Sequence, residues 1–264
     1  MIQAFFGFKK YPFAKDIDSK KIFSSQSMKE LFARFEYMKQ TRGLMLLTGQ
    51  PGAGKTLAIR TFIEDLNPNL YYPVYIPLST VSHMEFYRQL CVRLTGEAFF
   101  RKSVCFDKIQ RAIIELVNDQ KKVPVVVIDE AQMLKAENLF EIPIILNFQI
   151  DSVDPLLFIM VGQTYLRDII ARPVHKSLNQ RFSLKYALQS LDKQETKDYI
   201  THQLALAGCR KPILSDAAIE TIFLNTSGNP RDIGNLTLKV LTLAAKEKLQ
   251  TITEEEIYRA SKEL

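Results

Sequence analysis

The octapeptide GQPGAGKT at residues 49–56 constrains this chain more than any other feature of its sequence. An apolar run at 44–48 precedes it, and a helical pattern follows over 57–66. The octapeptide matches the phosphate-binding pattern G-x-x-x-x-G-K-[ST], in which glycines let backbone amides turn toward phosphate oxygens. The following helix would point its positive N-terminus at the same anion. A plain glycine turn needs neither the lysine nor the change from strand to helix, so the sequence predicts a nucleotide-binding loop.

The expected ligand of this loop is ATP with Mg²⁺. We expect Lys55 to reach the β- and γ-phosphates and the hydroxyl of Thr56 to ligate the metal ion. The residues predicted to bind the nucleotide are Gly49, Gln50, Pro51, Gly52, Ala53, Gly54, Lys55, Thr56 and Leu57.

The second chemical signal is VVVIDEAQ at 125–132, an apolar strand that ends in two acids. Acids at the carboxyl end of a buried parallel strand lie at the ligand edge of the sheet. We expect Asp129 to hold the Mg²⁺-bound water and Glu130 to orient the water that attacks the γ-phosphate. The alternative is an acidic turn after a strand.

The order of the predicted elements indicates an α/β fold, a P-loop parallel sheet flanked by helices, followed by a small all-helical domain. Strands are expected at 44–48, 71–78, 123–130, 156–162 and 182–188, and helices at 84–94, 106–118 and 137–150 between them. After residue 189 the pattern is helical, beginning with Asp192 as an N-cap and Glu195 three residues later. The predicted domains are an N-terminal strap at 1–43, the nucleotide-binding domain at 44–189 and a helical lid at 190–264.

The charge of the chain is unevenly distributed. Residues 1–189 contain 25 Lys and Arg against 18 Asp and Glu, whereas the remainder is nearly neutral and the whole chain has a net charge of +6. A basic surface favours polyanionic partners, although a generic basic surface would give the same count. No apolar run approaches the roughly 20 residues of a membrane span. The three cysteines are widely spaced and predict no disulfide framework. We therefore expect a cytoplasmic protein without a membrane partner.

Several stretches together resemble the AAA+ ATPases, and more narrowly the ExeA-type group. They are FFGFKKYPF, LLTGQPGAGKT, VVVIDEAQML, FIMVGQ, LNQRFSLKY and SGNPRDIGNL. One kind of protein in that group serves type II secretion and carries a membrane span and a peptidoglycan-binding part. The other kind is short and accompanies transposases, similar in role to MuB, TnsC and IstB. The present sequence resembles the second kind because it lacks those additions.

The resemblance implies roles for three more residues. Gln163 would sense the γ-phosphate, Arg181 would reach the ATP of a neighbouring subunit, and Arg231 would touch ATP in its own chain. Each has a plainer alternative: a polar residue at a strand end for Gln163, a surface arginine for Arg181 with Arg172 as a competitor, and an ion pair with Asp232 for Arg231. By the same resemblance, the YPF segment at 11–13 would lie near the adenine, with core packing by its phenylalanine as the alternative.

The resemblance also implies a function. The chain would assemble with ATP into a ring or helical filament on duplex DNA, and would recruit or stimulate a transposase. Candidate contacts to DNA phosphates are Arg101, Lys102, Lys121 and Lys122, each of which could equally belong to a solvated basic loop. Two other functions remain open: a secretion-associated ATPase without DNA affinity, and a nucleotide-switched scaffold with little hydrolysis.

Overall fold

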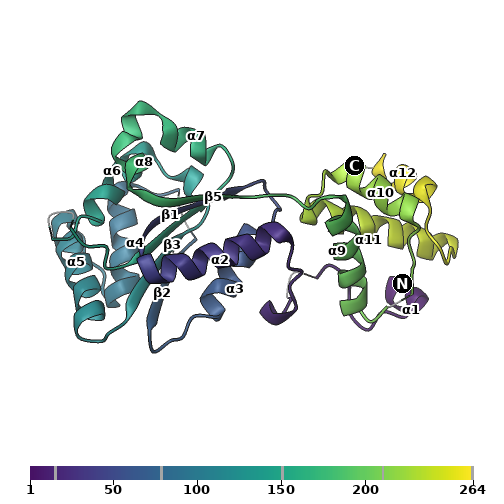
Figure 1. Ribbon diagram of the computed structural model, residues 1–264, viewed down its shortest axis with the longest axis horizontal. Coiled ribbons are helices and arrows are strands. Elements are labelled where there is room, and N and C mark those ends of the chain that lie inside the picture. The colour runs from purple at the N-terminus through teal and green to yellow at the C-terminus, as the bar shows by residue number, and fades with distance from the viewer. Residues whose placement is uncertain (15–16, 78–79, 150–151, 210, 263–264) are drawn as a thin grey trace. The chain divides into compact units, whose positions relative to one another are not determined.

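A computed structural model describes residues 1–14, 17–77, 80–149, 152–209 and 211–262 (Figure 1). The chain forms two compact units. A sheet unit comprises residues 30–49 and 55–188, and a helical unit comprises residues 1–29, 50–54 and 189–264.

Among the described residues of the sheet unit, five strands form one parallel sheet in the order β2-β3-β4-β1-β5. The strands are β1 (Gly43–Gly49), β2 (Tyr71–Ile76), β3 (Val123–Ile128), β4 (Leu157–Gly162) and β5 (Phe182–Leu188). Strand β1, which lies between β4 and the edge strand β5, pairs through Thr48 with Gly162 of β4 and through Gly49 with Leu188 of β5. Because all strands run in one direction, the residues that follow them gather at one edge, where α/β sheets bind ligands.

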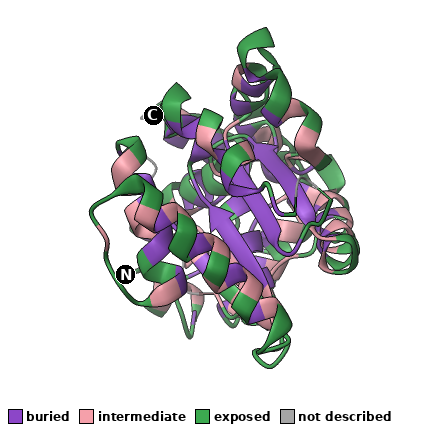
Figure 2. Ribbon diagram, turned by 90° about the vertical axis from the view of Figure 1, so that its left-hand side faces the viewer, coloured by how far each residue is buried: buried purple, intermediate pink, exposed green. Residues whose placement is uncertain are grey.

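Helices cover both faces of this sheet, as expected for a parallel sheet. They are α2 (Gln26–Thr41), α3 (Lys55–Glu64), α4 (His83–Thr95), α5 (Lys102–Asn118), α6 (Ala136–Ile145), α7 (Leu166–Ala171) and α8 (Lys176–Arg181). One core cluster joins alternate strand residues such as Leu46, Val126 and Phe158 to buried side chains of α4–α8. Helices α2 and α3 lie together in front of the sheet (Figure 1), and their Phe35 and Phe62 rings stack with centroids 4.3 Å apart. Figure 2 shows the buried strands between helices whose outer sides are exposed.

The helical unit has its own apolar core. Its helices are α1 (Ile2–Phe6), α9 (Lys193–Leu206), α10 (Asp216–Thr226), α11 (Pro230–Glu247) and α12 (Glu254–Ser261). Side chains from all five contribute to this core, Ile2 of α1 among them. The predicted cap at Asp192 forms with Glu195 as a capping box, in which each side chain accepts a hydrogen bond from the other residue's backbone. Phe13, from the segment expected near adenine, packs its ring beside Gly234 and edge-on to Tyr199.

The predicted fold class is confirmed, with local differences. Helix α5 begins at Lys102, four residues before the predicted start, and α6 contains Pro143 but ends at Ile145, before the predicted end at 150. Residues 78 and 150, at the ends of a predicted strand and a predicted helix, lie outside the described residues. The predicted 1–43 strap does not cluster as one piece: residues 1–29 belong to the helical unit and residues 30–43 to the sheet unit. Within the described part of the chain, no helix combines the length and apolar character required to cross a membrane.

Candidate nucleotide-binding site

The predicted phosphate-binding loop connects the end of β1 to the start of α3. Gly52 and Gly54 have φ angles of +88° and +102°, in the left-handed region that favours glycine. The amide of Ala53 donates to the carbonyl of Gln50 at 3.2 Å and closes a turn. Residues 50–54 cluster with the helical unit, whereas Gly49, Lys55 and Thr56 belong to the sheet unit.

Lys55 is a buried cation at the first position of α3. Its side chain is folded against its own loop, with Nζ donating to the carbonyl of Gly49 at 2.9 Å, and only 7% of the residue is exposed. A Cβ atom on Gly49 would lie 2.9 Å from the backbone oxygen of Leu188 and 3.5 Å from Cδ of Lys55. A side chain at residue 49 would therefore crowd the backbone of β5, whereas its contact with the lysine stem would be an ordinary one. A buried ammonium beside a helix N-terminus is suited to bind an anion.

The structure brings Asp129 and Thr56, the two residues expected at the metal, into contact. Oδ2 of Asp129 accepts hydrogen bonds from the Thr56 hydroxyl at 3.0 Å and from the Tyr75 hydroxyl at 2.8 Å, and Oδ1 accepts from the backbone amide of Glu130 at 2.8 Å. The donor set is one carboxylate and one threonine hydroxyl, which are oxygen ligands of the kind that Mg²⁺ uses beside phosphates and water. The described residues contain no cluster of three His, Cys, Asp or Glu that could hold a metal alone. These residues therefore fit a metal ion that arrives with a nucleotide.

Tyr75 is a site residue that the sequence did not reveal. Burial raises the pKa of its hydroxyl, and the hydrogen bond to Asp129 raises it further. The hydroxyl therefore stays protonated and remains a donor to the carboxylate. It lies near the end of β2, which two other strands separate from β1 in the sheet, so its place in the site becomes visible only with the strand order.

Glu130 and Gln163 are brought together through a third side chain, Gln132. The amide nitrogen of Gln132 donates to the Glu130 carboxylate, and its amide oxygen accepts from the backbone amide of Gln163 at 3.0 Å. Glu130 itself has a φ of +50°, an uncommon conformation for a residue with a side chain. Gln132 is part of the VVVIDEAQ stretch, but no local sequence pattern predicts its contacts.

In the helical unit, Arg231 lies in the first turn of α11, next to Asn229. The side chain of Asn229 caps this helix through the amide of Arg231 at 3.1 Å and donates to the carbonyl of Pro51 at 2.7 Å. A Cβ on Gly52 would lie 2.5 Å from Oδ1 of Asn229 and 2.7 Å from Cβ of Arg231. The predicted loop residues Pro51 and Gly52 thus pack against the start of α11.

Arg181 lies away from the ligand edge of its own sheet. It immediately precedes β5, whose first residue, Phe182, pairs with Leu44 at the start of β1. The phosphate-binding loop follows the opposite end of β1, roughly 20 Å away for a strand of this length. Arg181 lines a hollow of about 250 Å³ with Leu44 and Asp154, among others. It is therefore distant from the lysine and threonine of its own chain. The competitor Arg172 is exposed where α7 ends.

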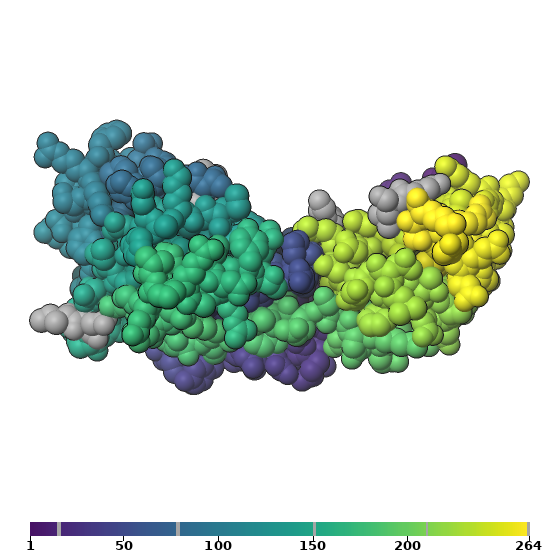
Figure 3. Space-filling model, turned by 90° about the horizontal axis from the view of Figure 1, so that it is seen from above, coloured from purple at the N-terminus to yellow at the C-terminus, as the bar shows by residue number. Residues whose placement is uncertain are grey.

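The four candidate DNA contacts fall into two pairs. Arg101 is exposed at the N-cap of α5, and Lys102 follows it with Nζ 2.6 Å from the Glu141 carboxylate. Lys121 and Lys122 follow the other end of α5, which is about 25 Å long. Figure 3 shows the blue and teal segments of this region on the exterior of the sheet unit. The two pairs therefore cannot contact the same phosphate.

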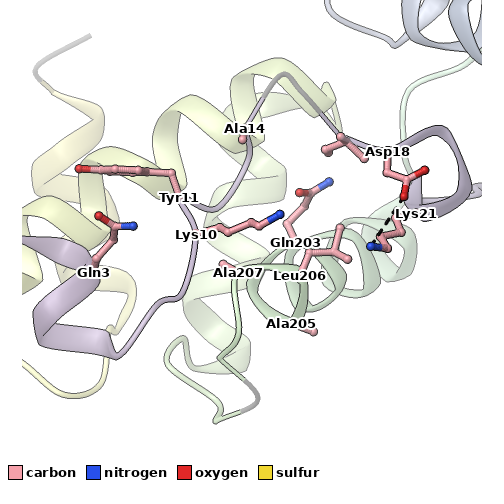
Figure 4. Close-up of a pocket in the computed structure, with 11 residues that line it drawn as sticks. Gln3, Lys10, Tyr11, Ala14, Asp18, Lys21, Gln203, Ala205, Leu206 and Ala207 are labelled. Carbon is pink, nitrogen blue, oxygen red and sulfur yellow. Dashed lines mark ion pairs between the residues drawn. The ribbon is translucent and has the colours of Figure 1, made fainter.

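A separate cavity of about 770 Å³ lies in the helical unit between the N-terminal segment and the end of α9 (Figure 4). Lys10, Tyr11 and the buried Gln203 line it, and Lys21 at its rim pairs with Asp18 at 3.7 Å. Tyr11 belongs to the YPF segment expected near the adenine, whereas none of the predicted phosphate-loop, metal-binding or catalytic residues lines this cavity.

Comparison with known proteins places these features in context. The sequence signature described as AAA domain matches residues 38–170, just over half of the chain. General secretion pathway protein A of Aeromonas hydrophila is 27% identical over 267 residues, which cover 100% of this chain and 48% of that protein. The chain thus spans about half the length of this curated relative.

Similar folds are found among solved structures. The RuvB Holliday junction branch migration motor of Thermotoga maritima has a TM-score of 0.61 at 20% identity, with 94% of this chain and 74% of that chain covered. The ORC2 protein of Aeropyrum pernix has a TM-score of 0.68 at 15% identity, covering 97% and 72%. Drosophila ORC bound to DNA has a TM-score of 0.64 at 14% identity, covering 96% and 68%. At these identities the similarity concerns the fold.

The glycine loop between β1 and α3, the buried lysine and the order of the sheet define a P-loop protein that is built to bind nucleotides. With the signature that covers residues 38–170, this chain belongs to the AAA domain family.

Proposed function

We propose that this chain is a Mg²⁺-dependent ATPase that assembles on duplex DNA and recruits or stimulates a transposase. The observation that carries the ATPase part is the junction of Thr56, Asp129 and Glu130 beside the buried Lys55. Bound Mg²⁺ would neutralise charge on the phosphates. The chain's own residues have distinct roles: Lys55 binds the phosphates, Thr56 and Asp129 hold the metal and its water, and Glu130 orients the attacking water.

The proposed site is incomplete in a single chain. A guanidinium that stabilises charge on the transferred phosphoryl group is expected from Arg181, which lies at the other edge of its own sheet. A neighbouring chain would supply it, and Gln163 and Arg231 would contact the nucleotide from within the chain. ATP would thus hold subunits together in a ring or filament, and hydrolysis would release them.

The DNA part rests on charge and exposure. The first 189 residues contain 25 basic against 18 acidic residues, and Arg101 is exposed at the start of α5. Lys102 is less available to a phosphate than Arg101 because Glu141 already pairs with it. We expect contacts to the phosphate backbone with little reading of bases.

A second candidate function is favoured by one finding. The relative that is 27% identical over the whole chain is a general secretion pathway protein. A secretion-associated ATPase with the same nucleotide site would hydrolyse ATP but would have no affinity for DNA.

One pair of experiments tests these proposals. The protein is mixed with duplex DNA at low salt, with and without a slowly hydrolysed ATP analogue, and examined by negative-stain electron microscopy. Nucleotide-dependent assemblies on DNA support the transposition function, whereas ATP turnover without DNA binding favours the secretion function. For the chemistry, Lys55→Ala should lose nucleotide binding, and Glu130→Gln should bind nucleotide without turning it over. Normal turnover by Glu130→Gln would refute the assignment of the acid.

A further inference from the structure

Gln132 is a buried polar residue placed between two predicted site residues. It lies in the short helical turn Ala131–Met133 that follows β3, and 7% of it is exposed. Both ends of its side-chain amide are bonded, one to the Glu130 carboxylate and the other to the backbone of Gln163. The turn that follows β3 and the end of β4 are thus joined by one side chain.

The chemistry of the partners fixes the orientation of this amide. The backbone N–H of Gln163 can only donate, so it must face the amide oxygen of Gln132. The NH₂ group therefore points at Glu130, whose carboxylate can only accept when it is ionised. A flipped amide would lose both hydrogen bonds, so Gln132 holds the carboxylate in one place.

The end of β4 leaves room for the amide of Gln132 because residue 162 is a glycine. A Cβ atom on Gly162 would lie 2.6 Å from the amide oxygen of Gln132 and 2.6 Å from a methyl carbon of Leu166. A side chain at residue 162 would therefore push the amide away from its position. Glu130 is constrained from its other side, because its left-handed backbone donates its amide to Asp129 at 2.8 Å.

We propose that Gln132 is a positioning residue, which holds the Glu130 carboxylate in the geometry for orienting the attacking water and ties it to the strand end that carries Gln163. This inference rests on the proposed ATPase function and assigns a residue on which its rate depends. A displacement of the backbone at Gln163, at the end of β4, would be transmitted to the Glu130 carboxylate through the side-chain amide of Gln132. Neither of the two hydrogen bonds involves the phosphate-binding loop, and the one to Gln163 uses its backbone amide and not its side chain, so we expect nucleotide affinity to change little when Gln132 is replaced.

The test separates the two hydrogen bonds of the amide. Gln132→Glu keeps an acceptor for Gln163 but places a second carboxylate against Glu130, whereas Gln132→Met removes both bonds at similar volume. Turnover, KM for ATP, nucleotide Kd and hydrogen exchange at the Gln163 amide are measured for both. Gln120→Glu, in an exposed segment after α5, controls for the change of charge.

In Gln132→Glu we expect kcat to fall about ten-fold or more, with KM and Kd within about two-fold of wild type and the Gln163 amide still protected. In Gln132→Met we expect the same loss of kcat together with faster exchange at Gln163. A residue that only supported the fold would lose turnover in step with amide protection. Loss of protection at Gln163 in Gln132→Glu would therefore overturn the inference, and so would normal kcat in that variant.

A second variant covers the case in which Gln132→Glu does not fold. Gly162→Ala leaves Gln132 in place but displaces its amide, and should lower kcat several-fold without changing Kd. Normal kcat in Gly162→Ala would also overturn the inference. If wild-type protein showed no turnover, the proposed ATPase function would fail and the inference with it. Wild-type turnover with unaffected variants would remove the inference alone.

Discussion

Asn229 stabilises both the start of α11 and the phosphate-binding loop, and replacing it should affect both. Its side-chain oxygen caps α11 at 3.1 Å, and its side-chain nitrogen bonds the carbonyl of Pro51 in the phosphate-binding loop at 2.7 Å. Loss of a capping side chain costs about 1 kcal/mol of stability. Loss of a hydrogen bond costs about 1 kcal/mol, and more where an acceptor is left buried. Asn229→Ala removes both contributions and should therefore destabilise the helical unit by about 2 kcal/mol.

Asn229→Ser separates the contribution of the helix cap from that of the hydrogen bond to Pro51. Serine caps helices as well as asparagine does, but its hydroxyl is too short to cap α11 and also reach Pro51. We therefore expect Asn229→Ser to cost about 1 kcal/mol, with the first turn of α11 as protected as in wild type. Both variants should weaken nucleotide binding, because both release the loop.

Native-state hydrogen exchange at the amides of α11 reports the opening free energy, and a nucleotide titration reports the effect on the loop. The reasoning is refuted if Asn229→Ala costs less than about 0.5 kcal/mol, or if the serine variant is as damaging to α11 as the alanine variant. Unchanged nucleotide affinity in both variants would show that the Pro51 contact does not hold the loop.

Three further predictions concern the neighbour's arginine, the acid at the metal site and the last helix. Lys55→Ala and Arg181→Ala should each abolish ATP turnover when assayed alone. An equal mixture should regain part of the activity, because the Lys55→Ala chain still has the arginine that the Arg181→Ala chain lacks, and the latter has an intact phosphate-binding loop. An inactive mixture would contradict the arginine assignment. Tyr75→Phe should lower the free energy of unfolding by about 1–2 kcal/mol in urea titrations, since it removes a donor to a carboxylate; a change below about 0.5 kcal/mol would count against that hydrogen bond. Burial alone would raise the pKa of the Glu256 carboxyl, but hydrogen bonds from Thr253 outweigh it and the pKa is lowered from 4.5. That carboxyl therefore adds stability above about pH 4.5 that is lost as the pH falls through its folded pKa, so the destabilisation caused by Glu256→Gln should shrink in acid; a difference constant from pH 7 to pH 3 would refute it.

The fold was accessible from the sequence because local signals agreed with one another. The glycine loop fixed the junction of a strand and a helix, and the acids of VVVIDEAQ fixed the end of a second strand. The cap at Asp192 marked the start of the last four helices because a capping box is entirely local. The start of α5 was misplaced because its first turn, Lys102–Cys105, follows an arginine that makes no side-chain cap.

The candidate site was accessible only in part. Thr56 and Asp129 could both be proposed as metal-site residues because each lies in a recognisable stretch, GQPGAGKT and VVVIDEAQ. Tyr75, Gln132 and Asn229 could not, because their contacts depend on strand order and on side-chain packing between segments far apart in the sequence. Asn229 reaches Pro51 across 178 positions of the chain, and no local pattern records such a contact.

The location of Arg181 has a consequence for the order in which chains would assemble. If each chain lends its arginine to the next one, every chain gives to one neighbour and receives from the other, so the association is head-to-tail. An open row of chains would then have two unlike ends, one with an arginine that has no site to serve and one with a nucleotide site that lacks its arginine. Such an assembly is polar, and a partner could distinguish its two ends by binding a terminal chain alone.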